Sequence, residues 1–456
     1  MSVRGVERKG LAVALGSRAP SGLRSRRVML PPGPRLPRSV QTLGWLFRAA
    51  PWLGRLRERY GDAFTLRIAH EDDWVMLCSP DAARQVLTGD PAVLSGGEAN
   101  AVLRPVVGRR SMLLLDGEAH VMQRRLLLPA FHGESVRRYR ATVAAIVERE
   151  VASWPAGIAF RVRPRLQALT LEVIVHAIFG VSDVERAARL RAALVRMLDG
   201  AAAPARLLLL VAAGPDRVER WGLLRSSLRP VDALIAAEIN RARVDPRLCD
   251  REDILAALVR ARDEDGRPVG DQEVRDQLLT LLIAGHETTA SALAWALERL
   301  VRHPAAWQRM RDEIAVGEDT YVDAVIKETL RLRPVFPIIR RRLTQPTEIG
   351  GWALPAGVAV VPCIYLIHRD SGCYPDPLAF RPERFLERSA RSYSWIPFGS
   401  GVRRCIGASF ALMEMKTALQ VIASSTHLQA ANAAPERIAR RANMFVPAED
   451  ALLIRR

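Results

Sequence analysis

Lysine is nearly absent from this sequence. It occurs at only three of the 456 positions, Lys9, Lys327 and Lys416, although the formal net charge is +18. Arginine therefore supplies almost all of the positive charge. The arginines are spread along the whole chain rather than gathered with aromatic residues in one basic stripe, which argues against nucleic-acid binding. The charge fits a basic face that attracts an acidic partner, or a solvated surface shaped by a GC-rich bacterial codon bias, and we favour the second as the main cause.

Cysteine is scarce as well, and long apolar runs are lacking. The five cysteines are odd in number, widely spaced and without a C-x-x-C pair, which excludes a disulfide framework and indicates a reducing compartment, the cytoplasm. No stretch reaches the roughly 18 consecutive apolar residues of a membrane span. The best candidate, residues 201–214, is interrupted by Pro204 and Arg206. We therefore expect a protein without a transmembrane anchor.

Residues 1–28 differ in composition from the rest of the chain. They hold six arginines and one lysine against a single acid, and their one apolar run is too short for a secretory signal. We expect a disordered basic extension here. The remainder, residues 29–456, shows no internal repeat and no second boundary, which predicts one folded domain.

Apolar periodicity predicts a mainly α fold with small β sheets. Residues 63–68 and 74–78 have the character of strands around a polar turn, and strand-like pieces return within 352–362. Between them the pattern is helical. The predicted long helices cover residues 119–150, 165–179, 183–199, 229–243, 252–264, 271–303, 320–332 and 406–424.

The helix predicted over residues 271–303 is interrupted in its middle by the polar sequence AGHETTAS, which begins at Ala284. Glycine and threonine are poor helix formers, so their presence inside an apolar helix needs a reason. Ala284, Gly285 and Thr288 share one helix face and would form a groove for something flat or small. Glu287 would supply a proton beside the Thr288 hydroxyl. The alternative is a notch for helix packing.

Three further stretches carry charged residues at regular spacing. Glu328 and Arg331 are three residues apart, which favours an ion pair on one helix face, and Arg384 could share the same carboxylate. His120 and Arg124 are one helical turn apart and could clamp an anion. For the last pair, an exposed basic face is the ordinary alternative.

The sequence FGSGVRRCIG, residues 398–407, fails as a dinucleotide-binding fingerprint because Arg404 stands where the third glycine is needed. Its other notable feature is one thiol, Cys405, between two arginines and two glycines. The alternative to a functional thiol is a buried core cysteine without a metal. Two unpaired cations beside it argue against an apolar core position.

Taken together, these stretches resemble the cytochrome P-450 family of heme-thiolate monooxygenases, over nearly the whole chain. The heme-loop pattern F-x-x-G-x-R-x-C-x-G is met at Phe398, Gly401, Arg403, Cys405 and Gly407. The oxygen-binding helix pattern is met at Ala284, Gly285, Glu287, Thr288 and Thr289. The E-x-x-R pair is Glu328 and Arg331, and the later P-E-R-F is Pro382 to Phe385.

The resemblance implies a mainly α fold with heme b between the long central helix and the helix that follows the cysteine ligand. Cys405 would bind the iron, as in the thiolate case of this family. Gly401 and Gly407 would let the backbone turn and approach the porphyrin closely, Phe398 would pack beside the sulfur, and Ala284 and Gly285 would lie against the heme. The heme propionates would be bound by His120, Arg124, Arg403 and one arginine of Arg340, Arg341 and Arg342, of which we favour Arg341.

The resemblance also implies a reaction. Thr288, with Glu287 and ordered water, would deliver protons while the O–O bond of dioxygen breaks, and one oxygen atom would enter a lipophilic substrate such as a fatty acid, terpenoid or steroid. The chain has no flavin or iron–sulfur motif, so its electrons would come from a ferredoxin, or a flavodoxin, with an NAD(P)H-dependent reductase. We expect a monomer of the bacterial type, with specificity segments near residues 96–110, 195–215 and 335–339.

Two rival functions use the same thiol. A heme protein that senses gas or redox state would need Cys405 but neither Glu287 nor Thr288. An enzyme of the same fold that uses peroxide commonly departs from the acid and threonine pair, which this chain retains.

Overall fold

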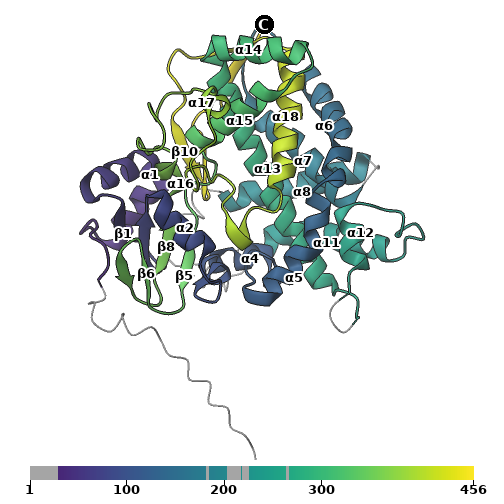
Figure 1. The fold of residues 1–456 in the computed structure, drawn as a ribbon. Coiled ribbons are helices and arrows are strands. Elements are labelled where there is room, and N and C mark those ends of the chain that lie inside the picture. The colour runs from purple at the N-terminus through teal and green to yellow at the C-terminus, as the bar shows by residue number, and fades with distance from the viewer. Residues whose placement is uncertain (1–28, 181–183, 203–216, 218–224, 263–265) are drawn as a thin grey trace, which may run out of the picture.

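The structure is a computed structural model that describes residues 29–456 apart from 181–183, 203–216, 218–224 and 263–265 (Figure 1). The disorder predicted for residues 1–28, and most of the apolar candidate 201–214, lie outside the described residues. Helices dominate the described chain, as the periodicity predicts. None of the described helices is long and apolar enough to cross a bilayer.

One five-stranded sheet lies beside the N-terminal helices. Its strand order is β1-β2-β8-β5-β3, in which β2 and β8 are parallel and the other neighbours antiparallel. The strands are β1 (Ala63–Arg67), β2 (Asp73–Leu77), β3 (Leu94–Ser95), β5 (Arg341–Leu343) and β8 (Ala359–Pro362). The neighbouring helices are α1 (Arg38–Tyr60), which contacts β1, and α2 (Pro80–Thr88), which contacts β8.

The other described strands form three small sheets. They pair β10 (Ile438–Arg441) with β11 (Met444–Pro447), β6 (Thr347–Ile349) with β7 (Trp352–Leu354), and β12 (Leu452–Arg455) with both β4 (Ala159–Arg161) and β9 (Leu428–Ala430). All pairs in these sheets are antiparallel.

The helical part is organised around α13 (Asp271–Val301), which is buried along most of its length. It packs along α7 (Val162–Phe179) and also contacts α11 (Arg225–Arg243), α15 (Thr320–Leu332) and α18 (Ala408–Ser425). The remaining long helices are α5 (Gly117–Leu127), α6 (Glu134–Ala152), α8 (Val184–Ala202), α12 (Ile254–Arg260) and α14 (Pro304–Ala315). In Figure 1, α13 runs through the middle of the helical part, with α18 beside it.

Two features of the fold differ from the sequence prediction. The single helix predicted over residues 119–150 is two helices, because a 3₁₀ turn with Pro129 at its start and Gly133 with φ +60° separate α5 from α6. Helix α1 is not predicted at all. Its apolar period is obscured by Pro51 inside the helix and by a kink at Arg48.

Candidate active site

The loop before α18 holds Cys405 in a tight backbone turn. Gly399 and Gly401 both have φ +68°, and a Cβ on Gly401 would lie 2.0 Å from the carbonyl oxygen of Leu87. Only glycine fits such a position. The amide of Cys405 donates to the carbonyl oxygen of Phe398 at 2.9 Å, which closes the loop. The Phe398 ring packs on the apolar core.

The Cys405 thiol is exposed but closely surrounded by protein atoms. The residue is accessible to solvent, yet surrounding protein atoms are dense enough that burial raises the pKa of the thiol. A hydrogen bond from the Gly407 amide and the charges of Arg124 and Arg404 act in the opposite direction and lower that pKa. Cys405 lies just before the N-terminal end of α18. The positive potential at that end of the helix adds to the effects that favour a thiolate.

Helix α13 presents an accessible patch in the middle of its buried length. Ala284 is exposed, although Leu282 and His286 on either side of it are buried. The hydroxyl of Thr288, one turn later, donates to the Ala284 carbonyl at 2.7 Å. An exposed alanine inside a central helix means that a hollow adjoins α13 at this point.

Gly285 faces the other way. A Cβ at this position would lie 2.9 Å from Cδ1 of Ile174 on α7, so the glycine allows the two helices to approach closely. Of the two interpretations of the AGHETTAS sequence, helix packing therefore describes Gly285, whereas the groove describes Ala284 and Thr288.

Four cationic or titratable side chains converge near the cysteine loop. They are His120 and Arg124 on α5, Arg341 at the start of β5, and Arg403 within the loop. Burial, followed by the charges of Arg403, Arg124 and Arg341, lowers the pKa of His120 to about 4. Burial and the charge of Arg403 lower the pKa of Arg341 to about 10. Each of these side chains therefore lies within electrostatic range of another cation.

One carboxylate opposes this cluster. Asp116 pairs with Arg403 at 2.5 Å and accepts hydrogen bonds from the Ser95 hydroxyl and the amides of Gly96 and Gly97. These hydrogen bonds and the charge of Arg403 outweigh burial and hold the pKa of Asp116 below its usual value. Sequence reasoning missed Asp116, although it lies four residues before His120 in a stretch already singled out.

The structure separates the three consecutive arginines. Arg340 pairs with Glu71, and Arg342 pairs with Asp72 and Glu98 at 3.0 Å each. Arg341 points to the other side of the strand, is 8% exposed, and donates to the carbonyl oxygen of Arg340. No carboxylate among the described residues pairs with Arg341. The cluster therefore carries an excess of positive charge in a partly buried place.

The Glu287 carboxylate is held from α7. It accepts hydrogen bonds from Nε2 of Gln167 at 2.5 Å and from the guanidinium of Arg163 at 3.3 Å, and Arg163 also pairs with Asp450 at 2.6 Å. Because the single proton of the Thr288 hydroxyl goes to Ala284, no direct hydrogen bond runs from Thr288 to Glu287. Sequence reasoning missed these partners, which carry no local signal because they are more than a hundred residues from Glu287.

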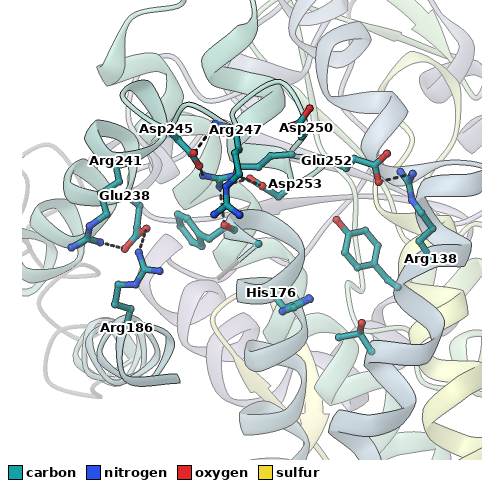
Figure 2. Close-up of a pocket in the computed structure, with 15 residues that line it drawn as sticks. Arg138, His176, Arg186, Glu238, Arg241, Asp245, Arg247, Asp250, Glu252 and Asp253 are labelled. Carbon is teal, nitrogen blue, oxygen red and sulfur yellow. Dashed lines mark hydrogen bonds and ion pairs between the residues drawn. The ribbon is translucent and has the colours of Figure 1, made fainter. Parts of the chain in front are cut away.

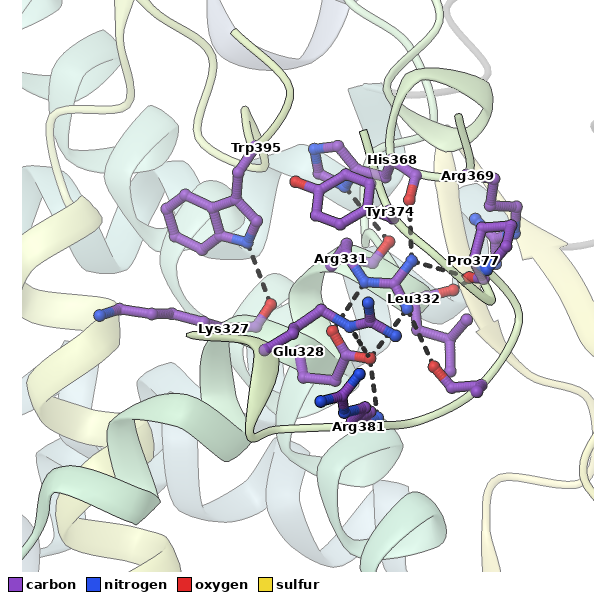
Figure 3. A network of polar contacts seen from close by, with 12 residues as sticks. Lys327, Glu328, Arg331, Leu332, His368, Arg369, Tyr374, Pro377, Arg381 and Trp395 are labelled. Carbon is purple, nitrogen blue, oxygen red and sulfur yellow. Dashed lines mark hydrogen bonds and ion pairs between the residues drawn. The ribbon is translucent and has the colours of Figure 1, made fainter. Parts of the chain in front are cut away.

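A buried charge network is centred on Glu328 and Arg331 of α15 (Figure 3). The Glu328 carboxylate accepts two hydrogen bonds from Arg331, at 2.7 and 2.8 Å, and one from Arg384 at 3.1 Å, as the sequence spacing predicts. Glu328 and Arg331 are fully buried. Arg331 also donates to the carbonyl oxygens of His368 and Pro377 at 2.8 Å each.

His368 connects this network to the cysteine loop. Its Nδ1 lies 3.2 Å from the carbonyl oxygen of Arg331, and its Nε2 accepts a hydrogen bond from the amide of Ile396 at 2.8 Å. Ile396 lies two residues before the loop begins at Phe398. Burial and the charges of Arg331 and Arg369 lower the pKa of His368 to about 3, so the ring is neutral at pH 7.

A separate hollow of about 700 Å³ lies between α6, α7, α11 and the segment before α12 (Figure 2). Its lining is highly charged, and many of the charges pair with one another, as Arg138 does with Glu252 and Arg251 with Asp245 and Asp253. A catalytic pocket for a lipophilic molecule is predominantly apolar, so this hollow does not suit that role.

Comparison with known proteins identifies the family. The family model described as Cytochrome P450 matches residues 31–446. The chain is 43% identical over 426 residues to cytochrome P450 135B1 of Mycobacterium tuberculosis, covering 92% of this chain and 89% of that protein. It is 37% identical over 434 residues to cytochrome P450 138 of Mycobacterium bovis, covering 94% of this chain and 97% of that protein.

Solved structures agree on the fold. The retinoic acid bound cyanobacterial CYP120A1 matches with a TM-score of 0.83 at 24% identity, over 94% of this chain and all of that chain. A cytochrome P450DA heme domain matches with a TM-score of 0.78, over 94% of this chain and 98% of that chain. The chain belongs to the cytochrome P450 family. It is accordingly a heme-thiolate monooxygenase.

The residues of this site fit a heme. A heme is flat, needs one axial ligand from the protein and carries two propionate carboxylates. The structure has an accessible thiol, a small exposed residue on a central helix, and a cationic cluster with too few carboxylates of its own. The thiol matches the axial ligand, the small residue matches the flat face, and the cationic cluster matches the two carboxylates of that cofactor.

Proposed function

We propose that residues 29–456 form one catalytic domain, to which residues 1–28 are an extension, and that this domain inserts one oxygen atom from dioxygen into a lipophilic substrate. The observation that carries the proposal is the exposed Cys405 thiol beside a cationic cluster that has too few carboxylates to balance its charge. Bound heme would supply the activation of dioxygen. The residues of the chain would bind the cofactor, exclude water and move protons.

Each site residue has a role in this proposal. Cys405 ligates the iron through its thiolate, and the Gly407 amide hydrogen bond stabilises that charge. His120, Arg124, Arg341 and Arg403 bind the propionates, with Arg341 favoured over its neighbours because Arg340 and Arg342 already pair with acids. Phe398 and Ala284 line the cofactor, and Gly285 sets the depth of the groove by letting α13 approach α7.

Glu287 and Thr288 move protons. The Thr288 hydroxyl is partly exposed on the same stretch as Ala284, and it can donate to water when it gives up its hydrogen bond to the Ala284 carbonyl. The Glu287 carboxylate is held by Gln167 and Arg163 and makes no direct hydrogen bond to Thr288, so ordered water would connect the two groups. This arrangement would favour the monooxygenase function over a heme sensor, which has no use for it.

Exposed and buried apolar side chains bear on the substrate, and exposed arginines bear on the redox partners. Apolar side chains in the segment 335–339, such as the buried Val335 and the exposed Phe336, favour a lipophilic ligand, a fatty acid, terpenoid or steroid. Retinoic acid, which is bound to the cyanobacterial CYP120A1, is such a ligand. Exposed arginines beside the cysteine loop, including Arg125 and Arg404, favour an acidic ferredoxin or flavodoxin with an NAD(P)H-dependent reductase. We propose that the protein is cytoplasmic, because NAD(P)H is a cytoplasmic electron source. We also propose that it is a monomer.

We expect lipophilic compounds, and not their hydrophilic analogues, to shift the heme spectrum of the purified protein. A compound that does so should be converted to a product with one added oxygen when ferredoxin, reductase and NAD(P)H are present. Isotopically labelled dioxygen measures the origin of that oxygen atom. A product whose added oxygen carries no label, and so comes from water, would contradict the proposal.

Replacing Thr288 by alanine should uncouple electron use from product formation. Without the hydroxyl, proton delivery would be impaired, and electrons from NAD(P)H would reduce dioxygen to hydrogen peroxide instead of supporting oxygenation. Product formed per NAD(P)H should therefore fall by at least about tenfold, which is less than the full contribution of general acid catalysis. Substrate binding should be unchanged. The measurements are NAD(P)H consumption, peroxide and product.

The matched control is Thr288→Ser, which keeps the hydroxyl and should restore most of the coupling. Full coupling in Thr288→Ala would refute the proposed role of this residue.

A further inference from the structure

Exposed apolar side chains are concentrated at one end of the described chain. Of the fourteen large apolar side chains that are exposed among the described residues, five lie within the nineteen positions from Met29 to Phe47. Their exposed fractions range from 41 to 63%, for Met29, Leu36, Val40, Leu43 and Phe47. Single exposed apolar residues are ordinary on a protein surface, but a cluster of them marks a contact surface.

Three of these residues form a stripe along α1. Val40, Leu43 and Phe47 are spaced by three and four positions, so they share one helix face, and Leu36 extends that face beyond the helix start. The opposite face, with Trp45 and Ala49, is buried. Helix α1 contacts β1 and β10 and lies at the edge of the molecule (Figure 1). Nothing in the described part of the chain covers the stripe.

The charge next to the stripe is strongly positive. Helix α1 contains five arginines and one acid, Glu58. Arg48, Arg55 and Arg59 are exposed and pair with no carboxylate among the described residues, and Arg35 before the helix is in the same state. The sequence before Met29 adds six arginines and one lysine against one acid.

We propose that α1 is a docking surface for an anionic lipid bilayer, with Val40, Leu43 and Phe47 inserted among the acyl chains. An apolar stripe flanked by arginines is the composition of helices that lie in a membrane interface. The unpaired arginines would then contact lipid phosphates, which attract basic residues at short range. A protein partner would need acidic residues placed opposite these arginines as well as an apolar face. An anionic lipid surface offers both negative charge and apolar chains at every position, so it fits the positive charge without such placement.

The test is flotation of the heme-loaded, full-length protein with vesicles. One set is phosphatidylcholine alone and the other is phosphatidylcholine mixed with phosphatidylglycerol. We expect binding to the anionic set that weakens as salt is raised. The triple variant Val40→Asp, Leu43→Asp, Phe47→Asp should bind at least about tenfold more weakly, because each change removes an inserted apolar group and adds a repelled charge.

A matched variant controls for general surface effects. Ile158→Asp, Val244→Asp, Leu378→Asp changes three side chains that are exposed to at least the same extent but lie elsewhere on the surface, and it should bind as the unchanged protein does. Both variants should keep the heme spectrum, because none of these side chains is buried.

Four results would overturn the proposal, three from the full-length chain and its variants and one from a truncated chain. The first is equal vesicle binding by the two triple variants, and the second is no binding of the unchanged protein to anionic vesicles. The third is a dimer in sedimentation that the α1 variant abolishes, which would make the stripe an interface between two copies. A chain without residues 1–28 should still bind through α1, and complete loss of binding there would assign the contact to the extension instead.

Discussion

Cys405→Ser abolishes oxygenation and the red-shifted absorbance band of the reduced, carbon monoxide-bound protein. Serine has nearly the same shape, and the residue is exposed rather than part of the packed core, so the fold should survive. The serine hydroxyl would not supply the strongly electron-donating thiolate that, on a bound heme, favours cleavage of dioxygen. Turnover should fall by at least about a thousandfold, as for other groups on which the chemical step depends.

The chain offers a matched control for this change. Cys249 is also free and exposed, but it lies in the segment before α12, so Cys249→Ser should leave both band and turnover unchanged. Circular dichroism measures whether the helices persist in each variant. A normal thiolate band in Cys405→Ser would contradict the assignment of the ligand.

Glu328→Gln should be the most destabilising single change in the charge network. The fully buried carboxylate accepts hydrogen bonds from Arg331, Arg384 and the amide of Arg381. A neutral amide of the same size leaves two guanidinium groups without a counter-charge, which costs about 3–5 kcal/mol for a buried pair. The free energy of unfolding, measured in denaturant by circular dichroism and heme absorbance, should fall by that amount.

The comparison variant is Glu134→Gln, which removes an ion pair with Arg137 of the same i,i+3 spacing at an exposed position. Its effect should stay within about 0.5 kcal/mol, as for other exposed pairs. We also expect Glu328→Gln to lose heme more readily, because His368 joins this network to the cysteine loop. An equal loss of unfolding free energy in the two variants would show that burial does not determine how much an ion pair contributes to stability.

Helices with strong apolar periodicity and clear ends were predictable from the sequence. The prediction for residues 320–332 coincides with α15, and that for 271–303 differs from α13 by two residues at its end. Helix α1 was not predictable in this way. Its exposed face is apolar and a proline lies inside it, so the pattern of one buried and one polar face is lost.

Some parts of the candidate site were predictable from the sequence and others were not. Local motifs predicted the cysteine loop, the polar stretch of α13 and the Glu328 pair, since each is contained in a few consecutive residues. Contacts between distant segments were not predictable. The hydrogen bond from Arg163 to Glu287 spans 124 positions, and nothing near either residue indicates it. The sequence favoured Arg341 over its two neighbours without a physical reason, and the structure supplies one, because Arg340 and Arg342 pair with acids whereas Arg341 pairs with none among the described residues.

The position of His368 gives the cysteine loop a sensitivity to acid. Its ring takes up a proton only near pH 3 in the folded protein, whereas an unfolded histidine does so near its ordinary pKa of 6.5. Because the unfolded chain binds the extra proton first, the stabilisation is complete above about pH 6.5 and is lost progressively as the pH falls towards 3. Protonation would also turn Nε2 from an acceptor into a donor that faces the Ile396 amide. Acid would therefore detach the cysteine loop from its support through one imidazole, which is not part of the cationic cluster.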